Sequence, residues 1–226
     1  GGKENSLIVS AQDTVCVFNG ADAVSPEAPI VIGDKNQIVG SATLYTRFGD
    51  TLYEHLLIFK EFEMWVISGT NPGDYQRLKI SDTGCVAPGT IGSCNTGFEI
   101  APGVKRHVVI WQSDHSINMF DGNTIDVISD DIYNYFDRTK AECISSGFIS
   151  NSEAFFDEKL LEYHWLFFNE SSNSINNELV FDVRKKKWFK INRGSGNRLQ
   201  IGYTVKDTYG ETYTYGGIDT GYIERL

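Results

Sequence analysis

Five carboxylates near the middle of the chain could do acid–base chemistry: Asp114, Asp121, Asp126, Asp130 and Asp131. Two carboxyl groups that flank a glycosidic bond can hydrolyse it, one as the acid and the other as base or nucleophile. Asp130 and Asp131 are adjacent, so on a strand they would point to opposite faces, and in a turn they would act as caps. The other three lie where hairpin turns are expected, and Asp side chains commonly bond turn backbone. We therefore expect these acids to be structural and not catalytic.

Three of the four histidines stand just before similar apolar segments: His55, His107 and His164. Three imidazoles at one repeated position could converge on a metal ion. A polar residue repeated at a strand entrance more often serves packing or hydrogen bonding. The fourth, His115, lies in an expected turn. We predict no metal site.

The four cysteines are Cys16, Cys85, Cys94 and Cys143, and no Cys-x-x-Cys pair occurs among them. Cys85 and Cys94 could pair across a turn, but we expect reduced and partly buried thiols. The chain has no glycine-rich phosphate loop between a strand and a helix, and no nucleophile elbow or Cys–His signature. We predict no bound cofactor and no enzymatic activity.

Four tyrosines lie near the end of the chain: Tyr203, Tyr209, Tyr213 and Tyr215. Their alternation would place their rings along one face of the strands expected there. Exposed aromatic rings on one face can form a platform for sugars. The same alternation also suits packing against a neighbouring sheet, which we consider the better interpretation.

The charge of the chain argues against a surface that grips nucleic acid. Its 226 residues include 20 Lys and Arg against 30 Asp and Glu, a formal net charge of -10. Such a surface repels phosphates, although DNA could pass nearby without specific binding. The one basic run, residues 184–187, lies in an expected hairpin turn and is interpreted as solvated. No apolar stretch is long enough to cross a bilayer, so no membrane contact is expected.

The elements that must position all these residues repeat along the chain. Five segments share an apolar strand, a polar turn, a second apolar strand and then a glycine or polar residue: 7–20, 56–69, 108–122, 165–183 and 213–226. Their spacing of about fifty residues is typical of propeller blades. Further strands are expected between them, at 30–32, 41–47, 76–80, 97–100, 143–150, 188–191 and 200–205. A helical turn is expected at 130–136 with Ser129 as its N-cap, and a weak helical pattern covers 153–163.

These patterns predict an all-β fold: a β-propeller of about five blades, each an antiparallel four-stranded sheet. We expect residues 1–226 to form a single propeller domain. Because the chain begins and ends almost on a hairpin, one blade is short of strands. Either the two termini share a blade, or the chain is excised from a longer polypeptide.

Residues 57–136 resemble the propeller-type virion proteins of tailed bacteriophages, of the tail nozzle, hub or tail tubular type. The resembling motifs are the Gly-Cys-Val-Ala-Pro turn at 84–88, the Ser-Asp hairpin ending in Phe-Asp-Gly at 113–122, and Ile-Ser-Asp at 128–130. The segment NELVFDVRKKKWFKI, from Asn177, is similar to their unit of strand, basic turn and Trp-containing strand.

The resemblance implies a structural role in a virion, assembled in the host cytoplasm. The partners would then be other virion proteins and copies of the same chain in a ring around the DNA exit path, with DNA passing through unbound. The rival hypothesis is a carbohydrate-binding or glycoside-hydrolysing propeller.

Overall fold

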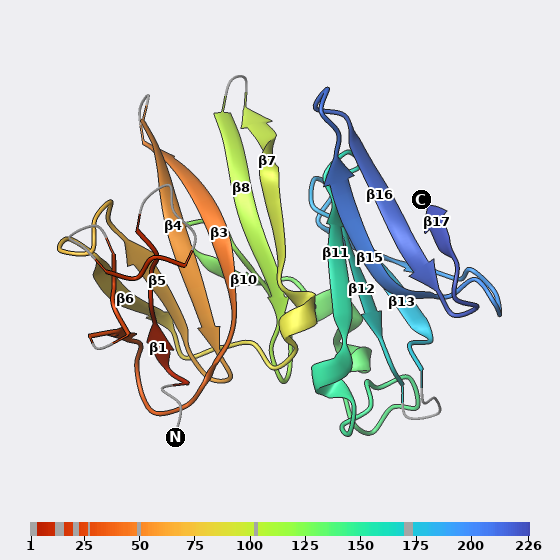
Figure 1. Ribbon diagram of the computed structural model, residues 1–226. Helices are drawn as coiled ribbons and strands as arrows, with labels where there is room; N and C mark the ends of the chain where they lie inside the picture. The colour runs from red at the N-terminus through yellow and green to blue at the C-terminus, as the bar shows by residue number, and fades with distance from the viewer. Residues whose placement is uncertain are drawn as a thin grey trace. The chain divides into compact units, whose positions relative to one another are not determined.

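A computed structural model describes residues 4–11, 16–19, 23–26, 28–48, 51–101, 104–169 and 174–226 of the protein. The described chain is all-β, with only short 3-10 helices between the strands (Figure 1). Its internal contacts divide it into two compact units, Gly1–Cys85 and Val86–Leu226, and each unit is considered by itself. No described helix is long and apolar enough to span a membrane.

The first unit is built on a four-stranded antiparallel sheet in the order β3-β4-β5-β6. Its strands are β3 (Ile38–Phe48), β4 (Thr51–Lys60), β5 (Met64–Ser68) and β6 (Gln76–Ser81). Ile58 of β4 and Ile67 of β5 pack against Ile32, which follows the short strand β2. This apolar cluster holds the N-terminal segment on one face of the sheet.

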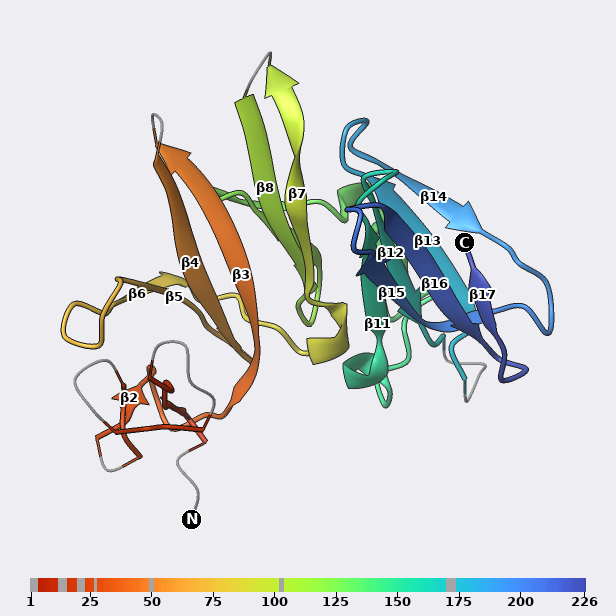
Figure 2. The same cartoon turned by 45° about the horizontal axis from the view of Figure 1, so that its top comes forward.

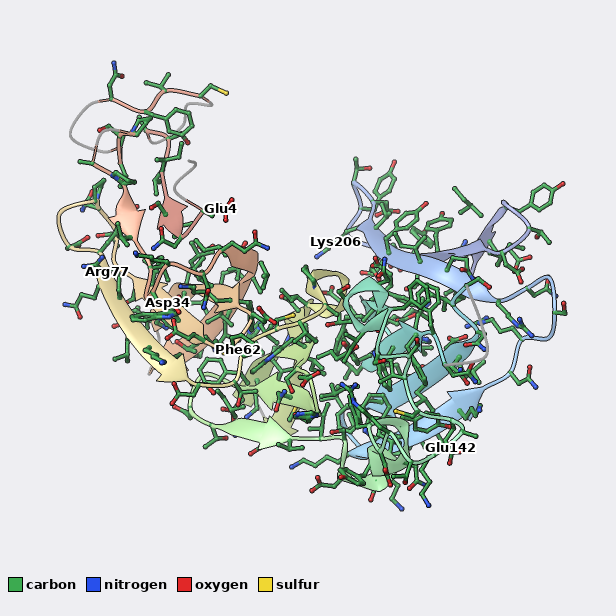
Figure 3. All side chains as sticks on the ribbon, turned by 90° about the horizontal axis from the view of Figure 1, so that it is seen from below. Glu4, Asp34, Phe62, Arg77, Glu142 and Lys206 are labelled. Atoms are coloured by element: carbon green, nitrogen blue, oxygen red, sulfur yellow. The ribbon has the colours of Figure 1, made fainter. Side chains whose placement is uncertain are left out.

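A buried lysine anchors the loop after β2 to the end of β4. The Lys60 side chain is 1% exposed, and its Nζ donates hydrogen bonds to the carbonyls of Ile32 (3.1 Å) and Asp34 (3.0 Å). The Asp34 carboxylate, labelled in Figure 3, pairs with the same ammonium group, and this bond lowers the pKa of Asp34. A buried charge is tolerated only where it is paired and hydrogen-bonded, as it is here.

The N-terminal segment differs from the predicted hairpin at 7–20. Strand β1 (Ser6–Leu7) pairs with β2 (Ile30–Val31), and Val9 forms an isolated bridge with Val24. The strand pairings of this segment therefore involve residues further along the chain, while within the segment Ala11 N–H donates to the carbonyl of Val17 (2.7 Å). Residues 12–15 and 20 of the segment lie outside the described part.

The second unit contains three successive antiparallel sheets, in the orders β10-β9-β8-β7, β11-β12-β13-β14 and β15-β16-β17. The first sheet comprises β7 (Gly92–Ala101), β8 (Val104–Gln112), β9 (Ile117–Phe120) and β10 (Ile125–Val127). The second comprises β11 (Glu153–Asp157), β12 (Glu162–Phe167), β13 (Asn177–Asp182) and β14 (Lys187–Ile191). The third comprises β15 (Leu199–Lys206), β16 (Thr212–Ile218) and β17 (Ile223–Arg225).

The first strands of these sheets are neighbours, with β11 in contact with both β7 and β15 (Figure 2). Each pair of adjacent sheets encloses its own apolar core. Trp165 and Phe181 face the first sheet, where they pack with Ile110. Phe155 and Leu199 lie in the second core, between β11–β14 and β15–β17. Strands β11, β12 and β13 of the middle sheet are therefore buried on both faces, which explains why their apolar residues are consecutive and do not alternate.

Four of the five predicted hairpins occupy equivalent places in their sheets. Segments 56–69, 108–122, 165–183 and 213–226 contain the second and third strands of the four larger sheets. The strands expected at 30–32, 41–47, 76–80, 97–100, 188–191 and 200–205 are also present. The repeat in the sequence thus corresponds to a repeated meander of consecutive antiparallel strands.

Two predicted elements are wrong. Residues 143–150 form turns, with one bridge between Ile144 and Asn169 and the 3-10 helix η3 (Ile149–Asn151), because Ser145-Ser146-Gly147 favours turns over a strand. Residues 153–163 form β11 and the start of β12 instead of a helix. Both faces of β11 are buried, so its apolar residues do not alternate and only mimic helical spacing.

Candidate functional site

A cleft in the second unit is lined by the first strands of its three sheets. Its lining residues are Ile91, Gly92, Ser93, Phe155, Phe156, Glu158, Thr204, Lys206 and Thr212. They come from β7, β11 and β15 and the residues next to them: Ile91 precedes β7, Glu158 follows β11, and Thr212 begins β16. Side chains from three sheets therefore meet at one concave surface, which is the usual setting of a ligand site.

Hydrogen bonds between the second and third sheets hold the walls of this cleft. Thr204 Oγ1 donates to the carbonyl of Phe156 (2.7 Å), and Thr214 Oγ1 donates to the buried carboxylate of Asp157 (2.8 Å). The Asp157 carboxylate also accepts the backbone N–H groups of Lys159 and Leu160, at 2.9 Å each. The turn that carries Glu158 is thus tied to β16.

The cleft combines an apolar floor with polar and charged groups. Phe155 and Phe156 are each 5% exposed, while Lys206, labelled in Figure 3, lies exposed at the end of β15. The hydroxyls of Ser93, Thr204 and Thr212 and the groups of Glu158 and Lys206 can donate and accept hydrogen bonds. These groups offer hydrogen bonds to a polar ligand or a peptide loop.

A buried ion network lies on the face of β11–β14 that meets β15–β17. The Glu178 carboxylate accepts hydrogen bonds from His164 Nδ1 (2.9 Å), Arg193 Nε (2.6 Å) and Arg193 Nη2 (2.9 Å). Burial by itself would raise the pKa of Glu178, but the bonds from His164 and Arg193 outweigh it and lower the pKa. The His164 ring stacks on Phe155, with ring centroids 4.4 Å apart. These contacts hold the connection between β14 and β15, which carries Arg193, against the middle sheet and leave the imidazole buried.

A second, smaller hollow lies beside this network. Its lining includes Asn176, Asn177, Asn192 and Arg198 together with Glu178 and Arg193. The Arg193 guanidinium is already engaged by Glu178, whose charge raises the pKa of Arg193. The hollow is therefore part of the polar seam between the two sheets.

Asp121 has the turn role expected from the sequence, and Asp114 lies in the turn between β8 and β9. Asp121 Oδ1 accepts the N–H groups of Asn123 and Thr124, at 2.9 Å each. Asp114 pairs with His115, whose Nε2 lies 3.0 Å from its Oδ2. Asp126 differs from the prediction, because it lies within β10, opposite Met119, and not in a turn.

Asp130 and Asp131 occupy the first turn of the 3-10 helix η2 (Asp130–Tyr135). Ser129 precedes this helix as predicted, but its side chain makes no cap hydrogen bond to it. The Ser129 hydroxyl instead accepts the N–H of Ile117 (3.0 Å), which ties the helix to β9. Acidic residues in this first turn suit the positive end of the helix.

The histidines occupy separate strands. His55 lies on β4, where its Nε2 is 2.8 Å from Thr46 Oγ1 and burial lowers its pKa. His107 lies on β8 and His164 on β12, in the ion network described above. The described residues contain no group of three or more His, Cys, Asp or Glu that could hold a metal ion. Cys85, Cys94 and Cys143 are buried, and Cys16 is exposed.

The tyrosines predicted to share a strand face do so on β15 and β16. The rings of Tyr203 and Tyr215 are stacked, with centroids 5.7 Å apart, and Arg225 lies 4.3 Å from the centroid of the Tyr213 ring. Tyr209 is 92% exposed in the turn between the two strands. The basic run at 184–187 lies in the turn between β13 and β14 and at the start of β14, as predicted.

Two important carboxylates were missed by sequence reasoning, namely Asp157 and Glu178. Asp157 follows Phe156, as Asp121 follows Phe120 and Asp182 follows Phe181. In each pair the Phe is buried and the Asp accepts the N–H groups two and three residues later. The recurring Phe-Asp pair is the signal that could have revealed Asp157. Glu178 has no comparable signal in the sequence. Its partner Arg193 lies 15 residues further along, in the connection between β14 and β15.

Comparison with known proteins adds no family: no protein-family model matches the chain, and no curated protein matches its sequence.

Proposed function

We propose that this protein is a non-enzymatic structural module, a β-propeller of about five four-stranded blades that forms part of a tailed-phage virion. The observation that carries the fold proposal is the repeated meander, with equivalent hairpins in the second and third strands of four sheets. In the second unit the first strands of successive sheets are neighbours, as the inner strands of propeller blades are. The motifs at 84–88, 113–122 and 128–130 support the virion role.

The use of the candidate acids supports a structural role. Asp121 and Asp157 each hold a turn through two backbone N–H groups, and Glu178 holds the connection between β14 and β15 through Arg193. Carboxylates committed in this way stabilise the fold and are not positioned to share a substrate. The partners would be neighbouring virion proteins and other copies of the chain.

A cryo-EM map of the particle that contains the full protein tests this proposal. We expect the map to show the chain as one subunit of a symmetric ring around the DNA path, with its sheets arranged as the blades of a propeller. Sedimentation of the isolated protein with duplex DNA at physiological salt should show no binding, because the net charge of -10 opposes it. Tight, salt-sensitive DNA binding would contradict the proposal, as would a parent assembly that is not a virion.

The cleft at the first strands favours a second candidate function, carbohydrate binding. Its hydroxyls, Glu158 and Lys206 could bond sugar hydroxyls. Glycan-array binding that is lost in Glu158→Gln, with Asp126→Asn as control, would favour this function. Release of reducing sugars by the wild type that is lost in Glu158→Gln would identify a glycosidase.

A further inference from the structure

The small hollow beside the Glu178 network has more hydrogen-bond donors in its lining than the protein itself uses. It lies where the connection between β14 and β15 passes the start of β13. Its charged lining residues are the carboxylate Glu178 and the two arginines Arg193 and Arg198. Glu178 and Arg193 neutralise each other through two hydrogen bonds. Among the lining residues, the positive charge of Arg198 is therefore left over.

Three side chains of this lining keep N–H groups that no acceptor uses. The Arg198 guanidinium has no hydrogen-bond acceptor and no carboxylate partner among the described residues. Arg193 bonds Glu178 through Nε and Nη2, and its Nη1 has no acceptor in the same part of the chain. Asn192 Oδ1 accepts the N–H of Gly194 (3.0 Å), while its Nδ2 donates to none of the described residues. What the hollow lacks is therefore an acceptor.

The backbone that carries these donors is held at both ends. Arg193 is bonded to β13, as described above. The carbonyl of Arg198 accepts the N–H of Asp219 (3.0 Å), and the carbonyl of Gly196 accepts the hydroxyl of Thr220 (3.1 Å). The connection is thus tied to β13 and to the turn after β16. Donors on a fixed backbone lose less conformational entropy when a ligand binds.

The size and charge of the hollow define the ligand that it can take. Its volume is about 30 Å³, which is about the share of one water molecule in the liquid and too small for a sugar ring or a nucleotide. A carboxylate group is small and planar, and it matches the fork of N–H groups on a guanidinium. A phosphate group is larger and carries more charge than Arg198 alone can balance. Glu224 of β17 also interacts electrostatically with Arg193, which limits the charge that the hollow can accept.

We propose that this hollow binds one carboxylate group, held by the Arg198 guanidinium through two parallel hydrogen bonds and by the Asn192 amide. The carboxylate belongs either to a free small acid or to an acidic side chain of another polypeptide, since the recognition chemistry is the same. The inference uses only the hollow and does not depend on the proposed virion role.

NMR titration of the full protein with sodium acetate tests the site, with the ionic strength held constant by sodium chloride. The signals to follow are the Nε–Hε group of Arg198 and the backbone amides of residues 192–198. We expect saturable shifts with a Kd of about 1–10 mM, and none with chloride alone. Arg198→Gln should weaken binding by about ten-fold or more. Arg198→Lys should weaken it less, because lysine keeps the charge but loses the fork.

The matched control is Arg184→Gln, which removes an exposed arginine of the same unit. Its guanidinium donates to the carbonyl of Leu160 and does not line the hollow, so acetate binding should be unchanged. Unchanged amide shifts of β7–β10 establish that each variant is folded. Acetate shifts no larger than those of chloride overturn the proposal. So does acetate binding that survives Arg198→Gln, that is equally lost in Arg184→Gln, or that is weaker than binding of inorganic phosphate.

Two peptides distinguish the sources of the carboxylate. One is acetyl-Gly-Gly-Glu-Gly-Gly-amide, and the other has glutamine in place of the glutamate. Binding of the glutamate peptide at least as tight as that of acetate assigns the hollow to a polypeptide partner. Binding of acetate alone assigns it to a small acid, and both results support a carboxylate site. Equal shifts with the glutamine peptide overturn the proposal, because a neutral amide would then suffice.

Discussion

At the scale of single residues, Gly202 permits the close approach of the second and third sheets. A Cβ atom at this position would lie 2.0 Å from Cδ1 of Phe155, whose ring is stacked on His164. We predict that Gly202→Ala lowers the free energy of unfolding by about 2 kcal/mol through overpacking. Urea denaturation followed by tryptophan fluorescence measures the loss. The control is Gly147→Ala, where nothing lies within 4 Å, and an equal loss there would contradict the packing argument.

The Glu178 network predicts a pH dependence of stability. Its pKa is lowered below the ordinary value of 4.5, so the unfolded chain takes up the proton first as the pH falls. The stability that Glu178 supplies is therefore present above about pH 4.5 and is lost as the pH falls through the folded pKa. Glu178→Gln should cost about 1–3 kcal/mol at pH 7.

Urea denaturation of wild type and Glu178→Gln between pH 7 and pH 2.5 tests this sign. The difference between the two proteins should be constant above about pH 5 and should shrink below about pH 4.5. The other carboxylates titrate in both proteins, so they cancel in the difference. A gap that stays constant, or widens, toward acid would contradict the assignment.

Sequence reasoning recovered the turn role of Asp121 and missed the interaction of Glu178 with His164 and Arg193. The first depends on neighbours two and three residues away, which the local pattern contains. The second depends on side chains 14 and 15 residues away, brought together by strand pairing. Long-range contacts of this kind have no local signature, and the cleft, which draws on three sheets, has none either.

At the scale of elements, the Phe-Asp pair at the end of a strand sets the following turn. In the β13–β14 hairpin Asp182 Oδ1 accepts the N–H groups of Arg184 and Lys185, both at 3.0 Å. We predict that Asp182→Ala destabilises the protein by about 1–2 kcal/mol, because these donors lose their shared acceptor. Thermal unfolding and urea denaturation check the value. Asp126→Ala, on an exposed strand position, should change stability by less than about 0.5 kcal/mol.

The helical pattern at 153–163 was wrong because both faces of β11 are buried. Strand and helix patterns can be distinguished when one face is buried and the other is solvated. In β11, Phe155 packs toward β15–β17 and Phe156 toward β7–β10, so both faces are apolar. The pattern then lacks alternation, and only the neighbouring sheets decide the conformation.

At the scale of the whole chain, the repeat predicted the order of strands, and the hairpins near the two ends of the sequence predicted one sheet that is short of strands. Two of the three fourth strands were predicted from the sequence, β6 from residues 76–80 and β14 from residues 188–191, whereas the three-residue strand β10 was not. The third sheet of the second unit stops at β17, a three-residue strand with no periodic signal. Whether a strand pairs at the edge of a sheet depends on residues that are distant in the sequence. A single repeat therefore does not predict the number of strands in its sheet.

The second unit should fold without residues 1–85. Among the described residues, its two apolar clusters lie within residues 94–218, and the strands of its three sheets pair with one another. The segment after the boundary is bonded within the unit: Val86 N–H donates to the Gln112 carbonyl (3.2 Å), and Tyr163 Oη donates to the Thr90 carbonyl (2.7 Å).

We predict that a fragment of residues 86–226 gives a dispersed amide NMR spectrum and one cooperative urea transition. A fragment of residues 104–226 lacks β7 and also the two hydrogen bonds made by Val86 and Thr90. It should not fold cooperatively. Equal behaviour of the two fragments, or a collapsed spectrum for residues 86–226, would contradict the independence of the unit.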